Sequence, residues 1–294
     1  MSNKDHLGQI SYLIQLLTDQ DDFVKQKVRA QLIELGEDAL PFLEIALRDE
    51  NAYLRIQAQE VIAAIFPRKL GEKFRQLAQK GLGRDVDLET GVLLIMEFGY
   101  PDSDPQACRD ILDSLAKSLK QNLPSGTDPA RTVLALTQLL FQQENFKGNT
   151  ENYTDPDNSY FNKVLENKTG LPITLSALCI LVANRLGLPI VGVGLPGHYI
   201  VKYNLAQNPI YFDPFHQGRI LAREDCIQII LEFGQTFEEH LLSQLTNRET
   251  LIRMMNNLIM VYRNFNESEK AETLSSYIKI LLNPSKNPLS EKTG

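Results

Sequence analysis

Residues 170–187 read GLPITLSALCILVANRLG, and this stretch decides the fold of the domain around it. Leu171 precedes a proline, which disfavours helical torsions at Leu171 and marks Pro172 as the start of a helix. From Pro172 to Leu186 the side chains are apolar on nearly every face, which predicts a helix buried at the centre of its domain. Gly187 is expected to end it.

Short runs rich in β-branched residues follow this helix. Residues 189–194, 198–203 and 210–213 are each expected to form a strand, and turn-rich segments connect them. The sequence therefore predicts a predominantly helical α+β fold. In this fold a small antiparallel sheet lies on a buried central helix, and helical segments flank the two.

Two polar residues in these strands are candidates for chemistry. A four-residue loop at 204–207 would pair Tyr203 with Asn208 and set His198 opposite Asp213, where opposed Cβ atoms lie about 4.5–5.5 Å apart. A carboxylate beside an imidazole holds the ring in one tautomer, as in catalytic triads. A register shifted by one residue would put the two side chains on opposite faces. The alternative is a strand histidine beside an aspartate that serves only in a turn.

The composition excludes several classes of function. The chain has 30 basic and 37 acidic residues, and this net charge of −7 argues against partners such as nucleic acid or an anionic membrane. The apolar stretch 171–183 is shorter than the roughly 20 residues that span a bilayer. Cys108, Cys179 and Cys226 form no CxxC pair and fit a reducing compartment, so a cytoplasmic protein is expected. No cofactor is expected.

Residues 1–67 contain an internal echo at an offset of 30 residues. A leucine-rich helix end, an acidic turn and a second amphipathic helix occur twice. The pattern is similar to short HEAT-type repeats, and two ordinary helical hairpins are the alternative. The expected segments are 1–67 (HEAT-like), 68–150 (helical), 151–235 (the α+β core), 236–284 (a helical hairpin) and 285–294 (a tail).

Several short motifs follow one another along the chain. They are GLPITLS (170–176), RLGLP (185–189), GVGLPGHY (192–199), DPF (213–215) and RMMNNL (253–258). In these motifs the chain resembles the SirB-type family of bacterial transglutaminase-like proteins, over roughly Asp87 to Pro284. The resemblance implies a transglutaminase- or papain-like core and a C-terminal hairpin similar to tetratricopeptide repeats.

The resemblance also implies that the usual nucleophile is missing. Active transglutaminases carry a cysteine where the central helix begins, and Pro172 occupies that position here. Cys179 lies two turns further along, about 10 Å away at 1.5 Å per residue, where a buried inert thiol is expected. Thr174 and Ser176 are candidate hydroxyl nucleophiles that His198 could activate, and capping or packing is the alternative role for both.

A cleft beside His198 is expected to have further lining residues. The candidates are Asp155, Asn158, Pro172 and Tyr199. Local roles as turn and cap residues would explain Asp155 and Asn158 equally well, because Asp and Asn side chains bond readily to nearby backbone groups.

A metal site is a further alternative for His198 and Asp213. His198, Asp213 and His216 are possible ligands, but ligands must converge on one point and be held there by further hydrogen bonds. The corner at Pro214–Phe215 argues against such convergence. No metal site is therefore expected.

Three functions are compatible with this pattern. The missing cysteine removes the acyl-enzyme route, so a regulatory or protein-interaction module is expected, with helical surfaces at both ends for a protein partner. The alternative is a hydrolase or acyltransferase on peptide or amide bonds that uses His198 and Asp213 with Thr174 or Ser176. A small-molecule sensor that uses the cleft as its pocket is the third.

Overall fold

The computed structural model describes residues 3–123, 126 and 128–284, with side chains from Gly8 onward. The predicted tail at 285–294 lies outside the described residues. Contacts divide the chain into two compact units, Met1–Lys73 and Phe74–Gly294, and the finer division predicted for the second unit stays a prediction. Among the described helices, none has the length and apolar character needed to cross a membrane.

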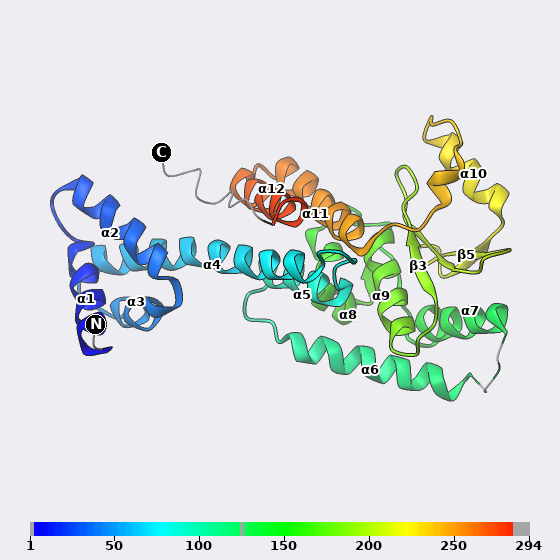
Figure 1. Ribbon diagram of the computed structural model, residues 1–294, viewed down its shortest axis with the longest axis horizontal. Helices are drawn as coiled ribbons and strands as arrows, with labels where there is room; N and C mark the ends of the chain where they lie inside the picture. Colours follow the sequence, from blue (N-terminus) through cyan, green and yellow to red (C-terminus); the bar gives the residue numbers. More distant parts are fainter. Residues whose placement is uncertain (1–2, 124–125, 127, 285–294) are drawn as a thin grey trace. The chain divides into compact units, whose positions relative to one another are not determined.

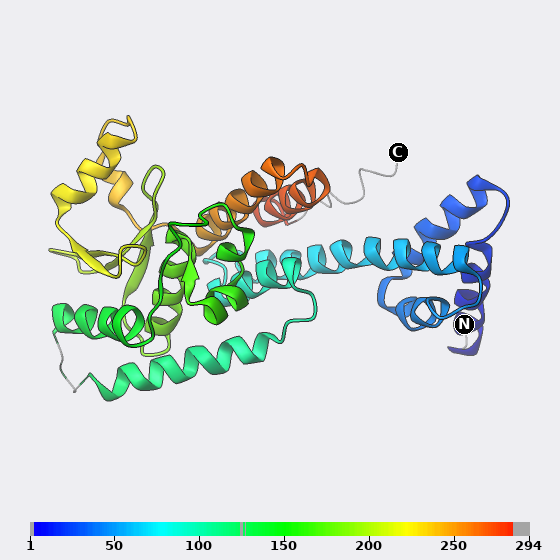
Figure 2. The same ribbon diagram turned by 180° about the vertical axis from the view of Figure 1, so that it is seen from behind.

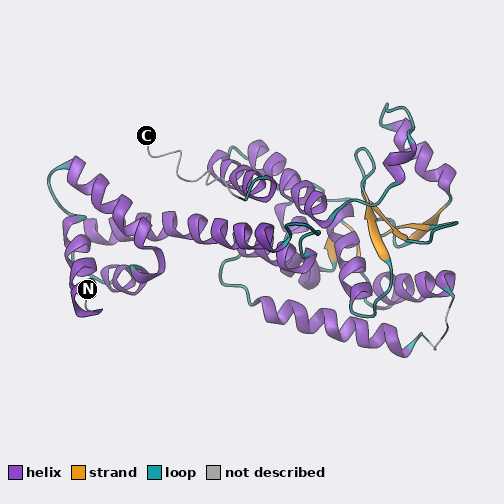
Figure 3. Ribbon diagram, in the orientation of Figure 1, coloured by secondary structure: helices purple, strands orange, loops and turns teal. Residues whose placement is uncertain are grey.

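The first unit is built from helices alone (Figures 1 and 3). Its elements are α1 (Asn3–Leu16), α2 (Asp22–Leu35), η1 (Gly36–Asp38), α3 (Leu40–Ala46) and the first part of α4 (Ala52–Lys80). Leucines from these helices meet in one apolar core, in which Leu17, Leu32 and Leu43 are fully buried. Pro41 lies in the first turn of α3, where a missing N–H costs no helical hydrogen bond.

The internal echo of this unit is present as a repeated turn. α2 begins at Asp22 and α4 begins 30 residues later at Ala52. In the first turn Asp19 accepts a 2.8 Å hydrogen bond from the N–H of Asp21, and in the second Asp49 accepts one of 2.8 Å from Asn51. The likeness to HEAT repeats stays a prediction.

The second unit surrounds a small sheet with helices (Figure 3). Its helices are α5 (Leu88–Gly99), α6 (Pro105–Gln121), α7 (Pro129–Thr137), η2 (Gln138–Gln143), η3 (Pro156–Ser159), α8 (Phe161–Asn167), α9 (Pro172–Asn184), α10 (Arg223–Glu232), η4 (Glu239–Leu242), α11 (Asn247–Asn264) and α12 (Ser268–Leu282). Its strands are β1 (Lys147–Gly148), β2 (Thr169–Gly170), β3 (Ile190–Val193), β4 (Ile200–Tyr203), β5 (Ile210–Asp213) and β6 (Arg219–Leu221). The predominantly helical α+β fold is confirmed.

The central helix is α9, as the sequence predicts. Every residue from Pro172 to Ala183 is buried. Helices α5, α6, α8 and α11 pack against it together with β3 and β4, and Figures 1 and 2 show β3 beside it from both sides. The helix ends at Asn184, two residues before the predicted end, and Gly187 adopts the left-handed conformation with φ +66°.

The main sheet has four antiparallel strands in the order β3-β4-β5-β6. Three of them match predicted strands, but β4 begins at Ile200, so His198 belongs to the preceding loop. The short strand β6 was not predicted, because its three residues follow a polar turn and one of them is Arg219.

The predicted register of the β4–β5 hairpin is wrong. Tyr203 pairs with Ile210 instead of Asn208, so the connection is the six residues 204–209 and not four. Asp213 is therefore opposite Ile200. The error is two residues. The loop before β4, and not strand pairing, brings the His198 side chain to Asp213.

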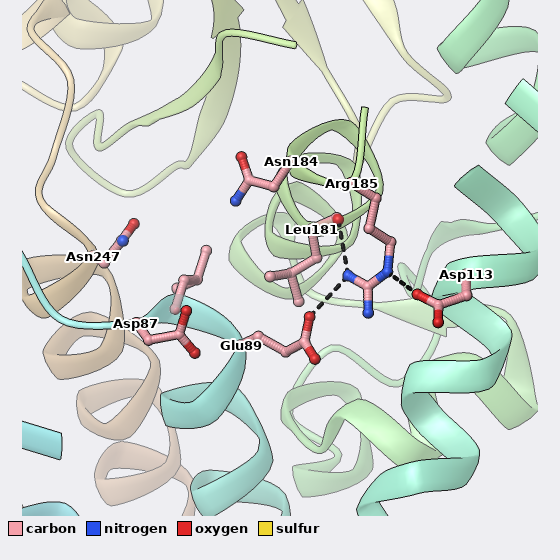
Figure 4. Close-up of a pocket in the computed structure, with 8 residues that line it drawn as sticks. Asp87, Glu89, Asp113, Leu181, Asn184, Arg185 and Asn247 are labelled. Atoms are coloured by element: carbon pink, nitrogen blue, oxygen red, sulfur yellow. Dashed lines mark hydrogen bonds and ion pairs between the residues drawn. The ribbon is translucent and has the colours of Figure 1, made fainter. Parts of the chain in front are cut away.

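Arg185 ties the C-terminal end of α9 to two other helices (Figure 4). Its guanidinium donates to Glu89 on α5 at 2.8 Å and also to Asp113 on α6. Burial disfavours the charge of Arg185, but the two carboxylates outweigh it and raise the pKa. These side chains line a cavity of about 330 Å³, and within it the arginine is already neutralised.

We expect Arg185→Met to lower the free energy of unfolding by about 1.5–3 kcal/mol, because two charged hydrogen bonds between helices are lost. Urea denaturation measures the change. Arg131→Met is the matched control, since Arg131 is 83 % exposed in its pair with Asp128 and should change stability by less than about 0.5 kcal/mol. Equal effects of the two substitutions would contradict this role of Arg185.

Candidate functional site

Asp213, at the end of β5, is the centre of the candidate site. Its Oδ2 atom lies 2.7 Å from Nε2 of His198 and 2.8 Å from Nδ1 of His216. Its Oδ1 atom accepts the backbone N–H groups of Phe215 at 2.9 Å and His216 at 3.3 Å. The side chain of Asp213 is only 3 % exposed, so both carboxylate oxygens are satisfied inside the protein.

The charge state of Asp213 follows from these contacts. Burial alone would raise the pKa of this carboxyl, but the hydrogen bonds from His198 and His216 outweigh burial and hold the pKa below its usual value of 3.8. Asp213 is therefore an anion at neutral pH. A carboxylate only accepts hydrogen bonds, so the ring nitrogens that face it carry protons, and the opposite nitrogen of each neutral ring keeps a lone pair.

The loop that carries His198 is held by α11. Nη2 of Arg253 donates to the carbonyl of Leu195 at 2.5 Å and to that of His198 at 2.6 Å. The hydroxyl of Tyr199 lies 2.7 Å from the hydroxyl of Thr250 on the same helix. These bonds fix the backbone on both sides of the His198 side chain, so Arg253 acts as a positioning residue.

A pocket of about 410 Å³ opens beside His198, Asp213 and His216. Its walls are mostly apolar, with Arg219 and Glu232 as charged groups. Phe233, at the end of α10, lies against Gly197, where a Cβ atom would overlap the phenyl ring. The four predicted lining residues other than His198 lie elsewhere: of the described residues that line this pocket, none is Asp155, Asn158, Pro172 or Tyr199.

Comparison with known proteins shows which family the chain belongs to. A sequence profile for the transglutaminase-like superfamily matches residues 106–256, which include α9, the sheet and His198. A UPF0162 protein of Xylella fastidiosa is 33 % identical over 192 residues, which is 63 % of this chain and 68 % of that protein. The chain belongs to the transglutaminase-like superfamily. The finer assignment to SirB-type proteins stays a prediction.

Other relatives share a shorter stretch. A UPF0162 protein of Vibrio cholerae is 27 % identical over 139 residues, which is 47 % of this chain and 51 % of that protein. The F-box only protein 21 of Homo sapiens is 31 % identical over 133 residues, covering 42 % of this chain but 21 % of that larger protein. No solved structure matches the chain.

The N-terminal end of the central helix of this transglutaminase-like core is buried. Leu171 and Pro172 are buried, and the hydroxyl of Thr174 donates to the carbonyl of Asn158 at 2.7 Å and accepts the N–H of Leu171 at 2.9 Å. The Ser176 hydroxyl is buried without a hydrogen-bond partner among the described residues. Neither hydroxyl is hydrogen-bonded to His198, so the structure does not bring the candidate nucleophiles to the His198–Asp213 pair.

The other predicted residues have local partners. Asp155 caps η3 through a 2.9 Å hydrogen bond from the N–H of Asp157. The side chain of Asn158 donates to the carbonyl of Asn152 at 2.7 Å and accepts from the side chain of Asn149 at 2.9 Å. Tyr199 is buried against Thr250. Asp155 and Asn158 thus have the turn and cap roles that the sequence analysis left open.

One expectation about this site is wrong. The corner at Pro214–Phe215 does not keep His216 away from His198 and Asp213; it forms a turn that brings His216 back, and the ligand atoms of the three residues lie within 4.8 Å of one another. Nothing in the sequence indicated that Arg253 and Phe233 lie beside the site. The motif RMMNNL contains Arg253, but a spacing of 55 residues from His198 gives no sign of their contact.

We expect all three cysteines to resist thiol reagents in the folded protein. Cys108, Cys179 and Cys226 are buried, and burial raises the pKa of each thiol, to about 12 for Cys226. A chromogenic disulfide reagent at pH 7.5 should therefore react with none before unfolding and with all three in urea. Rapid reaction of one thiol in the native state would contradict this assignment.

We expect Arg253→Met to lower the free energy of unfolding by about 2–3 kcal/mol, because two carbonyls lose a charged donor. The His198 ring resonances in NMR should also broaden or shift as the loop loosens. Arg263→Met, on the exposed side of the same helix, is the control. Unchanged His198 resonances in Arg253→Met would show that Arg253 does not position the ring.

Proposed function

We propose that this transglutaminase-like protein transfers no acyl group through a thiol and acts as a regulatory, protein-binding module. The start of α9 carries the proposal: Pro172 stands where the resemblance implies a cysteine, and the nearest thiol, Cys179, is fully buried. A thiol must form a thiolate that reaches the substrate in order to attack it. Burial raises the pKa of Cys179 and denies that access.

The pocket beside His198 supports a binding role. Phe233, at the end of α10, is 56 % exposed and lines this pocket together with the apolar side chains of Leu221 and Ile229. Large apolar side chains gathered around a concavity are typical of protein-binding surfaces. The partner that fits is a protein segment with an apolar side chain for the pocket.

The surface is tested by substitution. Phe233→Ser with Ile229→Thr, two residues that line the pocket, should reduce capture of the partner from native host cells at least tenfold, measured by quantitative crosslinking mass spectrometry. Phe265→Ser is the control, because Phe265 is also exposed but lies at the end of α11. A full-length chain with no partner, or a partner that binds the double variant equally, would overturn the proposal.

A hydrolase or acyltransferase is the second candidate, favoured by the 2.7 Å contact between His198 and Asp213. It requires Thr174 or Ser176 as the nucleophile. Both hydroxyls are fully buried, and that of Thr174 is bonded to the backbone on both sides of its turn.

We expect a fluorophosphonate probe to leave the folded protein unlabelled, because neither hydroxyl is open to a substrate or bonded to a base. Fluorescence of the protein on a denaturing gel measures the labelling, with a serine hydrolase as the positive control. Labelling of the wild type that disappears in His198→Ala would favour the second candidate over the first.

A further inference from the structure

We propose that His198, Asp213 and His216 form a binding site for a divalent transition metal ion of the Zn²⁺ class. This inference is independent of the proposed function, since a regulatory module and a hydrolase could each hold such an ion. Two imidazoles and a carboxylate are a ligand set that zinc accepts in sites with an open fourth position.

The distances fit one ion once the two imidazole rings are repositioned around it. The three ligand atoms lie within 4.8 Å of one another, and the carboxylate oxygen is 2.7 Å and 2.8 Å from the two ring nitrogens. Ligand atoms around a tetrahedral zinc ion are about 3.3 Å apart, from bond lengths of about 2.1 Å. An ion therefore needs each ring nitrogen to move about half an ångström away from Oδ2, and the two nitrogens to approach each other from a separation of up to 4.8 Å. The exposed side chain of His216 allows this movement.

Hydrogen bonds hold the Asp213 carboxylate in one orientation, as is usual for a carboxylate that binds a metal ion. The backbone N–H groups of Phe215 and His216 bond to Oδ1 of Asp213, which leaves Oδ2 directed at the two rings. The turn is fixed as well: the N–H of Gly218 donates to the carbonyl of Asp213 at 2.8 Å, and Gly218 packs closely on Thr137. Outer hydrogen bonds of this kind orient ligands before the ion arrives.

His216 is the observation that favours an ion over a catalytic pair alone. A triad needs one imidazole on its carboxylate, and His198 fills that role. His216 adds a second ring to the same oxygen, although its side chain is 62 % exposed and would be solvated in other rotamers. Because both rings reach the same oxygen, the three ligand atoms lie close enough together to share one ion.

Binding involves a proton shift within each ring. In the metal-free form the nitrogens that face Asp213 carry the protons, and metal coordination needs lone pairs there. A neutral ring moves its proton to the opposite nitrogen through solvent without net release, whereas a charged ring releases one proton, and one M²⁺ replaces two hydrogen bonds. The three residues line the pocket, where Glu232 and Arg219 are the charged wall residues.

The test uses the full-length chain without a histidine tag, stripped with EDTA and titrated with ZnCl₂ by isothermal calorimetry. We expect one Zn²⁺ per chain with a Kd of about 10 μM or lower, and no binding of Mg²⁺, which prefers oxygen ligands. Two-dimensional NMR of the imidazoles should show the ring protons moving in His198 and His216 together.

Variants separate this site from adventitious binding. His216→Ala should weaken Zn²⁺ binding at least tenfold without unfolding the protein, because the side chain is exposed. His240→Ala is the matched control: His240 is exposed and pairs with the single carboxylate of Glu238. His6→Ala controls for the remaining histidine. No 1:1 binding below 1 mM Zn²⁺, or His216→Ala binding like the wild type, would overturn the proposal.

Discussion

An α-helix that is apolar on every face must be covered on every side, and α9 imposes this constraint on the second unit. Its residues Pro172–Ala183 are all buried, and four helices and the four strands β1–β4 surround it. Burial of this kind contributes about 25 cal/mol for each Å² of apolar surface removed from water. The sheet, the His198 loop and α11 are consequently held around one rigid element.

That arrangement explains how the residues of the candidate site are held in order. α11 packs against α9 and, through Arg253, fixes the carbonyls of Leu195 and His198. The turn after β5 fixes Asp213 and His216. The scaffold of the transglutaminase-like core thus presents a carboxylate and imidazoles beside a pocket, and the start of α9 is a packed, proline-containing helix end.

The sequence predicted the parts of the fold that depend on local pattern. The apolar run of α9, the proline at its start and the glycine after its end are local signals, as is the repeated acidic turn of the first unit. The hairpin register was wrong because the connection at 204–209 has no turn motif that fixes its length. The contact of Arg253 with the His198 loop and the convergence of His216 depend on long-range packing and on one left-handed turn, with Gln217 at φ +57° and Gly218 at φ +73°.

The central claim is that this core carries out no thiol-based acyl transfer, and the mass of the intact protein tests it most directly. The folded chain would be incubated with an activated acyl donor, such as a p-nitrophenyl ester, and analysed by mass spectrometry before and after hydroxylamine treatment. The account predicts a protein of unchanged mass. One acyl group per chain on a cysteine, formed in the wild type and absent in His198→Ala, would contradict it.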